Sequence, residues 1–376
     1  MERADPQLTL PDELFLQRAY ELAARGAGST APNPPVGAVV VRDGRPVGEG
    51  YHHRAGAPHA EAEALRQAGS NALDATLYVS LEPCGHAGRT PPCTHAVIEA
   101  GVARVVAGAL DPAGHGGAAQ LRERGVDVAI AGDCAALDLI EMFARSSTSR
   151  RPYVAVKMAM SLDGAIARKP GVQERLSSEE ERRYVRELRV AYDAVMVGAG
   201  TVRVDDPALT VRPRHDRVRP YFRIVACETD VLPPERRVFA TEEGYAKTIL
   251  LAPAGLRQRF EELQETADIL CVGEPGSLTL DLAEAMQALR KRGICSILCE
   301  GGPKLAASLI ACGLTDRFYW AIAPVFLHNA RAVGVLGGID LAALGVRARF
   351  DRVERLGDDV MLSGPFDFAA TPLRSG

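Results

Sequence analysis

Aromatic side chains, basic charge and long apolar runs are all scarce in this chain. Aromatic residues make up 5% of its 376 residues, with one tryptophan, and the formal net charge is −4. A strand of nucleic acid is held by a basic groove with aromatic platforms, so we expect no nucleic-acid partner. No stretch approaches the roughly 18 apolar residues of a membrane span, and the first residues do not resemble a signal peptide. We therefore expect a cytoplasmic protein without membrane contact.

Eight cysteines are spread through the chain. Without export signals, free thiols or metal ligands are expected rather than disulfides. Cys295 and Cys299, four apart on a predicted strand, would share a face, but buried small side chains explain them better than a second metal site does. The full set is Cys84, Cys93, Cys134, Cys227, Cys271, Cys295, Cys299 and Cys312.

Strands and helices alternate in the first half of the chain, which predicts an α/β layer with a largely parallel sheet. Helices are predicted over 13–26, 58–69 and 93–101, and strands over 36–41, 76–83 and 102–110. The short polar segment 146–152 then precedes a new strand that begins at Tyr153. We place the domain boundary there, giving domains 1–149 and 150–376.

The second half alternates in the same way and predicts a second α/β domain. Strands are predicted over 193–200, 223–226, 247–252, 267–272, 294–302 and 314–326, and helices over 178–189, 281–293 and 304–313. Ser177 with Glu180 fits a capping box at the start of the first of these helices.

Four residues of the first half form a pattern typical of zinc chemistry. His59 and Glu61 begin a predicted helix, Cys84 follows a strand, and Cys93 begins the next helix. One imidazole and two thiolates leave a fourth zinc position for water, and a nearby carboxylate that is not a ligand can carry protons. We therefore predict a zinc-dependent deaminase with Glu61 as its proton shuttle.

Helix geometry restricts how this site can form. Residues two apart on a regular helix point about 200° away from each other. His59 and Glu61 can face one metal only if His59 lies where the backbone is not yet helical, and Pro58 before it fits such a start. Eight residues separate Cys84 from Cys93, more than in the short P-C-x-x-C form.

Other interpretations of the same residues remain open. A structural zinc module would close the fourth position with His86 or His95. A nucleic-acid base deaminase would share the zinc and Glu61, but the composition argues against it.

At these motifs the chain resembles the bifunctional riboflavin-biosynthesis deaminase–reductase family, and the resemblance covers nearly its whole length. It implies a cytidine-deaminase-like α/β/α domain followed by a dihydrofolate-reductase-like α/β domain. The segments that carry it are APNPPVGAVVV, GEGYHHRAGAPHAEAEAL and VSLEPCGHAGRTPPCTHAVIEAGVARVV in the first half, and KMAMSLDGAIA, LRVAYDAVMVGAGTVRVDDPALTVR and CEGGPKLAASLI in the second.

The resemblance also implies substrates and site residues. The first domain would deaminate 2,5-diamino-6-ribosylamino-4-pyrimidinone 5′-phosphate, with zinc on His59, Cys84 and Cys93. The second would reduce the ribosyl group with NADPH, and a homo-oligomer through this domain is expected. The implied substrate-binding residues are Asn33, His52, Arg89, Arg189, Leu209, Arg212 and Glu300, and the implied cofactor-binding residues are Thr201, Asp205, Gly301 and Gly302.

Several positions of the second half depart from the family pattern. Arg175 replaces an aromatic residue, Cys227 an aspartate, and His328 with Asn329 a glycine pair. In the first half the DPNP stretch is reduced to residues 111–114. An alternative hypothesis is therefore a paralogue with an active deaminase and a drifted or inactive reductase domain in a secondary-metabolite pathway.

Overall fold

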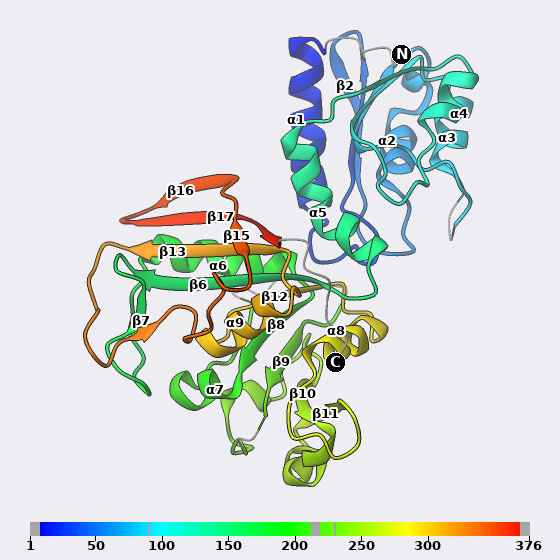
Figure 1. Ribbon diagram of the computed structural model, residues 1–376. Helices are drawn as coiled ribbons and strands as arrows, with labels where there is room; N and C mark the ends of the chain where they lie inside the picture. Colours follow the sequence, from blue (N-terminus) through cyan, green and yellow to red (C-terminus); the bar gives the residue numbers. More distant parts are fainter. Residues whose placement is uncertain (1–7, 89–90, 212–218, 229–230, 369–376) are drawn as a thin grey trace. The chain divides into compact units, whose positions relative to one another are not determined.

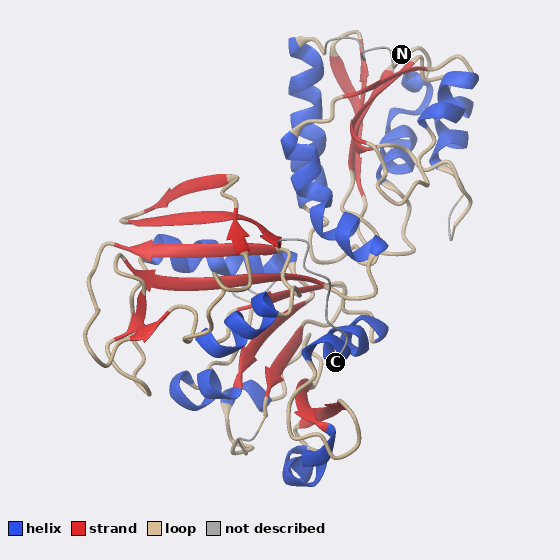
Figure 2. Ribbon diagram, in the orientation of Figure 1, coloured by secondary structure: helices blue, strands red, loops and turns tan. Residues whose placement is uncertain are grey.

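The computed structural model describes residues 8–88, 91–211, 219–228 and 231–368. Two predicted site residues, Arg89 and Arg212, lie outside these ranges. The chain forms two compact units, Met1–Ser149 and Arg150–Gly376, shown in Figures 1 and 2. Over the described ranges, no helix combines the length and apolarity needed to cross a membrane.

The first unit has one five-stranded sheet with the order β2-β1-β3-β4-β5. Its strands are β1 (Gly37–Arg42), β2 (Arg45–Tyr51), β3 (Thr76–Leu81), β4 (Arg104–Ala109) and β5 (Asp127–Ile130). Its helices are α1 (Leu10–Ala24), α2 (Ala60–Ala68), α3 (Cys93–Glu99), α4 (Ala118–Glu123) and α5 (Cys134–Thr148).

This sheet is mixed, and the expectation of a largely parallel sheet is wrong for the first unit. β1 pairs antiparallel with both β2 and β3, whereas β3, β4 and β5 are parallel. For the β1–β2 pair the reason is the turn between the two strands, where Asp43 and Gly44 have positive φ values of 52° and 72°. Two such residues make a tight hairpin turn that forces the neighbouring strands to run in opposite directions.

Helices cover both faces of this sheet and so confirm the predicted α/β/α layers. Figure 1 shows α1 and α5 on one face and α2, α3 and α4 on the other. Leu16 and Ile140 pack on the first face, and Ala64 and Val97 on the second, all of them buried. The buried valines of β1 alternate between the two cores, as a strand covered on both faces requires.

The second unit is built on a ten-stranded sheet with the order β11-β10-β9-β8-β12-β6-β13-β17-β15, with β16 beside β17. The strands of this unit are β6 (Tyr153–Ser161), β7 (Ala165–Ala167), β8 (Ala194–Gly198), β9 (Phe222–Ala226), β10 (Thr248–Pro253), β11 (Ala267–Val272), β12 (Ser296–Cys299), β13 (Arg317–Ala323), β14 (Val333–Gly334), β15 (Val346–Ala348), β16 (Arg352–Leu356) and β17 (Asp359–Phe368). Of these, β7 and β14 pair with each other in a separate two-stranded sheet. The α-helices are α6 (Glu179–Ala191), α7 (Ala199–Asp205), α8 (Leu282–Lys291) and α9 (Pro303–Ala311).

In the order of the sheet, the first seven strands, β11-β10-β9-β8-β12-β6-β13, are all parallel to one another, as the α/β pattern predicts. The next strand, β17, pairs antiparallel with β13. Helices α7 and α9 begin directly after the adjacent strands β8 and β12. In an open parallel sheet, ligands bind outside the carboxyl ends of such strands. The sequence analysis missed β7, α7 and all the strands after residue 326.

The predicted capping box at the start of α6 is wrong by one residue. Ser178, not Ser177, is the N-cap, and its hydroxyl accepts a hydrogen bond from the Glu181 amide at 3.1 Å. The Glu181 carboxylate does not return to the cap; it forms an ion pair with Lys157 of β6 at 2.5 Å. The Ser178 amide instead donates to Asp359 of β17 at 2.7 Å.

Candidate active sites

The three predicted metal ligands of the first unit converge. His59 is the N-cap of α2 with extended backbone angles of φ −74° and ψ 160°, which confirms that it lies before the regular helix. Cys93 is the first residue of α3, and Cys84 lies in the loop after β3. The His59 Nδ1 atom is 3.2 Å from Cys93 Sγ and 3.6 Å from Cys84 Sγ.

This donor set fits a zinc ion. All three ligand atoms lie within 4.8 Å of one another. Zinc bonds of about 2.0 Å to nitrogen and 2.3 Å to sulfur in a tetrahedron place such atoms about 3.6 Å apart. Among the described residues no other cluster of three or more such side chains could hold a metal. His86 stacks on His115 and His95 pairs with Glu99, so neither joins the cluster as the structural-zinc interpretation requires.

Glu61 lies beside the cluster on the first turn of α2. Its side chain is buried, and burial raises its pKa above the usual value, although His59 acts in the opposite direction. The hydrogen bond from Cys93 lowers the pKa of Cys84 to about 4, while the same interaction raises the pKa of Cys93. The lowered pKa of Cys84 favours the thiolate form that metal binding requires.

The shape of the Cys84 loop depends on Glu82, which lies in the quoted VSLEPC segment and to which the sequence analysis gave no role. Its carboxylate accepts hydrogen bonds from the amides of Asp111 at 3.0 Å and Ala118 at 2.7 Å. A Cβ atom at Gly116 would lie 2.0 Å from this carboxylate. The loop after β4 is thereby pressed against the Cys84 loop, where Cys84 and Gly116 form a β-bridge.

Asn33 and His52, the two predicted pyrimidine contacts, also meet. The Asn33 Nδ2 and His52 Nε2 atoms are 3.1 Å apart, and His52 Nδ1 is 3.0 Å from the Pro58 carbonyl oxygen. Burial lowers the pKa of His52, which favours its neutral form. The His52 and His59 rings lie 5.3 Å apart between centroids, so this pair adjoins the metal ligands.

The second unit contains a cavity of about 1510 Å³ that is large enough for a dinucleotide. Thr201, Asp205 and Gly302 line it, and the Gly302 amide donates a hydrogen bond to the Thr201 hydroxyl at 3.0 Å. Gly301 lies outside the lining, because it packs so tightly on β8 that a Cβ atom would be 2.7 Å from the Val197 Cα atom.

A second cavity of about 610 Å³ adjoins the first. Arg189, Leu209 and Glu300 line it, and the Arg189 guanidinium holds the Glu300 carboxylate with two bonds of 2.5 Å and 2.7 Å. Burial raises the pKa of Glu300, but Arg189 outweighs this effect and the net pKa is lowered. The pair is therefore ionised at neutral pH.

Lys157 is a further site residue that the sequence analysis missed. It lines both cavities together with Glu300, and its ammonium group pairs with the buried Glu181. The residue lies in the quoted K-M-A-M-S-L-D-G segment, but an isolated lysine on a strand gives no signal of its own. The pairing brings β6 and α6 together at the point where the cavities meet.

The positions of the second half that depart from the family pattern differ in their burial and in their distance from the cavities. Arg175 is exposed and lines the smaller cavity. Cys227 is buried beside the lining residue Glu228. The His328 amide bonds to Asp163, and the Asn329 side chain bonds to the Arg168 carbonyl, so these two shape a loop instead of lining a cavity.

Comparisons with known proteins agree with this division into two sites. Residues 10–109 match the cytidine and deoxycytidylate deaminase zinc-binding region, and residues 152–362 match the RibD C-terminal domain. The riboflavin biosynthesis protein RibD of Escherichia coli is 39% identical over 94% of this chain and 99% of its own. That of Aquifex aeolicus is 39% identical over 93% and 97%, respectively.

Solved structures show the same relationship. The structure of Acinetobacter baumannii RibD has a TM-score of 0.79 and 32% identity, covering 94% of this chain and 99% of that one. A diaminohydroxyphosphoribosylaminopyrimidine deaminase and 5-amino-6-(5-phosphoribosylamino)uracil reductase from Thermotoga maritima has a TM-score of 0.79 and 33% identity, covering 96% and 99%. With both halves matched in one order, the chain belongs to the RibD family of riboflavin biosynthesis proteins.

Proposed function

We propose that this chain catalyses two successive steps of riboflavin synthesis. It hydrolyses an amine from 2,5-diamino-6-ribosylamino-4-pyrimidinone 5′-phosphate and then reduces the ribosyl group of the product with NADPH. The observation that carries the proposal is the presence in one chain of a three-ligand metal site beside buried Glu61 and of two adjoining cavities around Glu300.

In the first step, His59, Cys84 and Cys93 would hold zinc. The bound ion supplies Lewis-acid chemistry that makes water a nucleophile near neutral pH. Glu61 takes one proton from the attacking water and delivers it to the pyrimidine ring nitrogen, and then transfers the second proton, from the added hydroxyl group, to the leaving amine. Asn33 and neutral His52 present both donors and acceptors for the edge of the pyrimidine. Arg89 is the predicted contact for the phosphate.

In the second step, NADPH would lie in the larger cavity, held by Thr201, Asp205 and the Gly302 end of α9. This cofactor supplies a hydride. The pyrimidine nucleotide would occupy the smaller cavity, with Arg189, Leu209, Arg212 and Glu300 as the predicted contacts. Lys157 lies where the cavities meet, and its ammonium group can donate the proton that the ribosyl ring oxygen needs as the sugar ring opens.

The formed cavities and the intact Arg189–Glu300 pair favour this bifunctional interpretation over a paralogue with an inactive reductase. The decisive experiment incubates the purified, zinc-loaded chain with the ribosylaminopyrimidine phosphate and NADPH. We expect ammonia release and NADPH oxidation in equal amounts at completion. Ammonia release without any NADPH oxidation would eliminate the reductase half of the proposal.

Three further expectations from the sequence stay predictions. They are a homo-oligomer formed through the second unit, a cytoplasmic location and the lack of a nucleic-acid partner. Sedimentation of the purified chain would test the first of them.

A further inference from the structure

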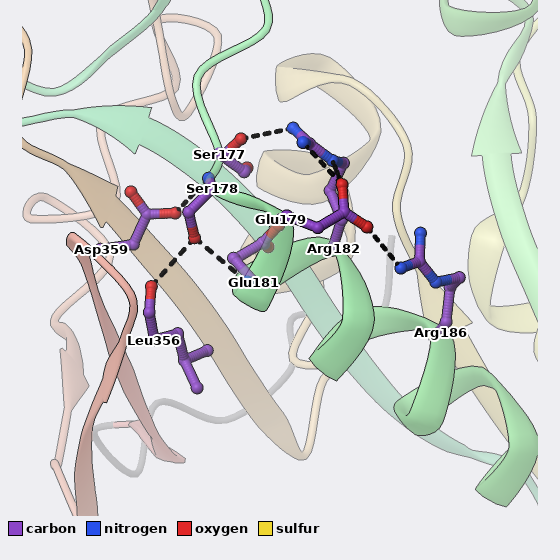
Figure 3. A network of polar contacts seen from close by, with 8 residues as sticks. All are labelled: Ser177, Ser178, Glu179, Glu181, Arg182, Arg186, Leu356 and Asp359. Atoms are coloured by element: carbon purple, nitrogen blue, oxygen red, sulfur yellow. Dashed lines mark hydrogen bonds and ion pairs between the residues drawn. The ribbon is translucent and has the colours of Figure 1, made fainter.

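The start of helix α6 is held by the turn of the β16–β17 hairpin, and we propose that Asp359 in this turn is a positioning residue for the reductase cavity. Asp359, buried to 2% exposure, accepts the Ser178 amide at 2.7 Å, and so occupies the donor that Glu181 would otherwise bind (Figure 3). Glu181 is thereby left to pair with Lys157 at the cavity. The inference rests on the proposed reductase function.

The sequence at the start of α6 has the capping-box pattern, but only one of the two hydrogen bonds of the box is formed. Ser178 is the N-cap and Glu181 is the third helical residue, which is the S-x-x-E pattern. In a closed box the serine hydroxyl accepts the amide of the third residue, and the glutamate side chain accepts the serine amide. Here the first bond is present and the second is replaced by Asp359.

The hairpin turn is fixed tightly against the helix. Leu356 pairs with Asp359, and the Ser178 hydroxyl donates to the Leu356 carbonyl at 2.9 Å. Gly357 in this turn has a φ of 64°, and a Cβ atom there would lie 2.6 Å from the Glu180 carboxylate. The acceptor for the Ser178 amide is therefore held in one place by the backbone of two strands.

Glu181, which does not bind the Ser178 amide, forms an ion pair with Lys157. Both side chains of the Lys157–Glu181 pair are largely buried, with exposures of 12% and 1%. Burial of an ammonium group without a carboxylate partner is costly, so Glu181 stabilises the buried position of Lys157 and directs its ammonium group. The same turn has two other acidic residues. Glu179 binds Arg182 and Arg186, as Figure 3 shows, and the Glu180 carboxylate lies against Gly357 of the hairpin turn. Glu181 is thus the carboxylate of this turn that Asp359 makes available to Lys157.

Removal of the Asp359 carboxylate should let the box close. In an Asp359→Ala variant the Ser178 amide loses its acceptor, and Glu181 turns back to it and leaves Lys157. We expect reductase kcat/KM to fall about tenfold, the scale of one lost bond to a charged group, while deaminase activity is unchanged. Asp359→Asn keeps an oxygen acceptor and should restore most of the rate. Asp358→Ala alters the exposed neighbour in the same turn and serves as the matched control.

A double-variant cycle separates this route from general destabilisation. If Asp359 acts through Glu181, Asp359→Ala should have no further effect on the reductase rate in a Glu181→Ala background. The labelling rate of Lys157 by acetic anhydride, followed by peptide mass spectrometry, should rise in Asp359→Ala and in Glu181→Ala but not in Asp358→Ala. This readout needs no catalysis.

The outcomes are distinguishable from failure of the proposed function. A wild-type chain that never oxidised NADPH would refute the reductase activity, yet the labelling of Lys157 would still test the role of Asp359. Unchanged Lys157 labelling in Asp359→Ala, or additive losses in the double variant, would overturn the inference.

Discussion

In the first unit, two short segments of the chain each supply two of the site residues. In the second unit, the site residues come from elements that lie far apart in the sequence. His59 and Glu61 are two residues apart at the start of α2, and Cys84 and Cys93 border one loop. The reductase site instead joins Lys157, Glu181, Arg189 and Glu300 through ion pairs between β6, α6 and the end of β12.

This difference has a physical basis in the ligands that each site serves. A metal ion draws its donors together with bonds far stronger than ordinary contacts, so short motifs at helix starts suffice. A nucleotide cavity must exist before its ligand arrives and needs charges held by partners within the protein. We therefore expect single substitutions in the first site to remove a group that takes part in the reaction. In the second site we expect them to break an ion pair that holds the cavity in shape.

The largest expected effect is on Glu61. In Glu61→Gln the proton shuttle is lost, so we expect ammonia release to fall by about 10²- to 10⁴-fold, while NADPH oxidation with pre-deaminated substrate is unchanged. Glu63 lies on the same helix as Glu61 and pairs with His53 of the preceding loop, and Glu63→Gln should keep both activities. Full deaminase activity in a zinc-loaded Glu61→Gln protein would contradict its assignment.

The ion pair of the second site should be the next most sensitive. In Glu300→Gln the partly buried Arg189 loses its charged partner, which should cost about 3 kcal/mol of unfolding free energy in the second unit and raise the KM of the reductase substrate. Denaturant unfolding and steady-state kinetics measure the two effects. Asp268→Asn, which breaks a half-exposed pair with Arg292, should change neither.

Residues that hold the metal ligands in position should also affect the first site, but less than Glu61 does. Glu82→Ala removes the carboxylate that holds the loop behind Cys84, and we expect zinc affinity to fall about tenfold, as for other residues that orient metal ligands. Chelator competition measures this without catalysis. Glu99→Ala, at an exposed position on α3, is the control. Equal affinities in the two variants would show that the Cys84 loop needs no such brace.

The smallest expected effect concerns stability in the first unit. Asp12 is buried and accepts bonds from Arg104, Tyr78 and Thr9; burial raises its pKa, but these bonds outweigh it and hold the pKa well below the usual range. Its folded pKa is depressed, so its stabilisation is present above the unfolded pKa and is lost as the pH falls toward the folded value.

We expect Asp12→Asn to lower the unfolding free energy by about 2 kcal/mol at neutral pH, with the difference from wild type shrinking below about pH 4. Unfolding curves at several pH values measure it. Asp127→Asn, which changes the largely exposed second partner of Arg104, should have little effect. A loss that did not depend on pH would exclude the charged form as its source.

Local sequence patterns were enough to predict the three side chains that converge in a cluster able to hold a metal ion. The spacing of His59 and Glu61 required a ligand before the regular helix, and the structure has it there. Alternation of strands and helices likewise gave two α/β layers. These features follow from local rules, because backbone periodicity and the donor preferences of zinc act over a few residues.

Other features became visible only in the folded chain, namely the antiparallel β1–β3 pairing, the strands after residue 326 and the partners of single charges. The start of α6 shows why. Its sequence favours a closed box between Ser178 and Glu181, but a buried aspartate 181 residues further along takes the serine amide. No local pattern can reveal such an acceptor, because the energy that selects it comes from burial and from charges that only the folded chain brings together.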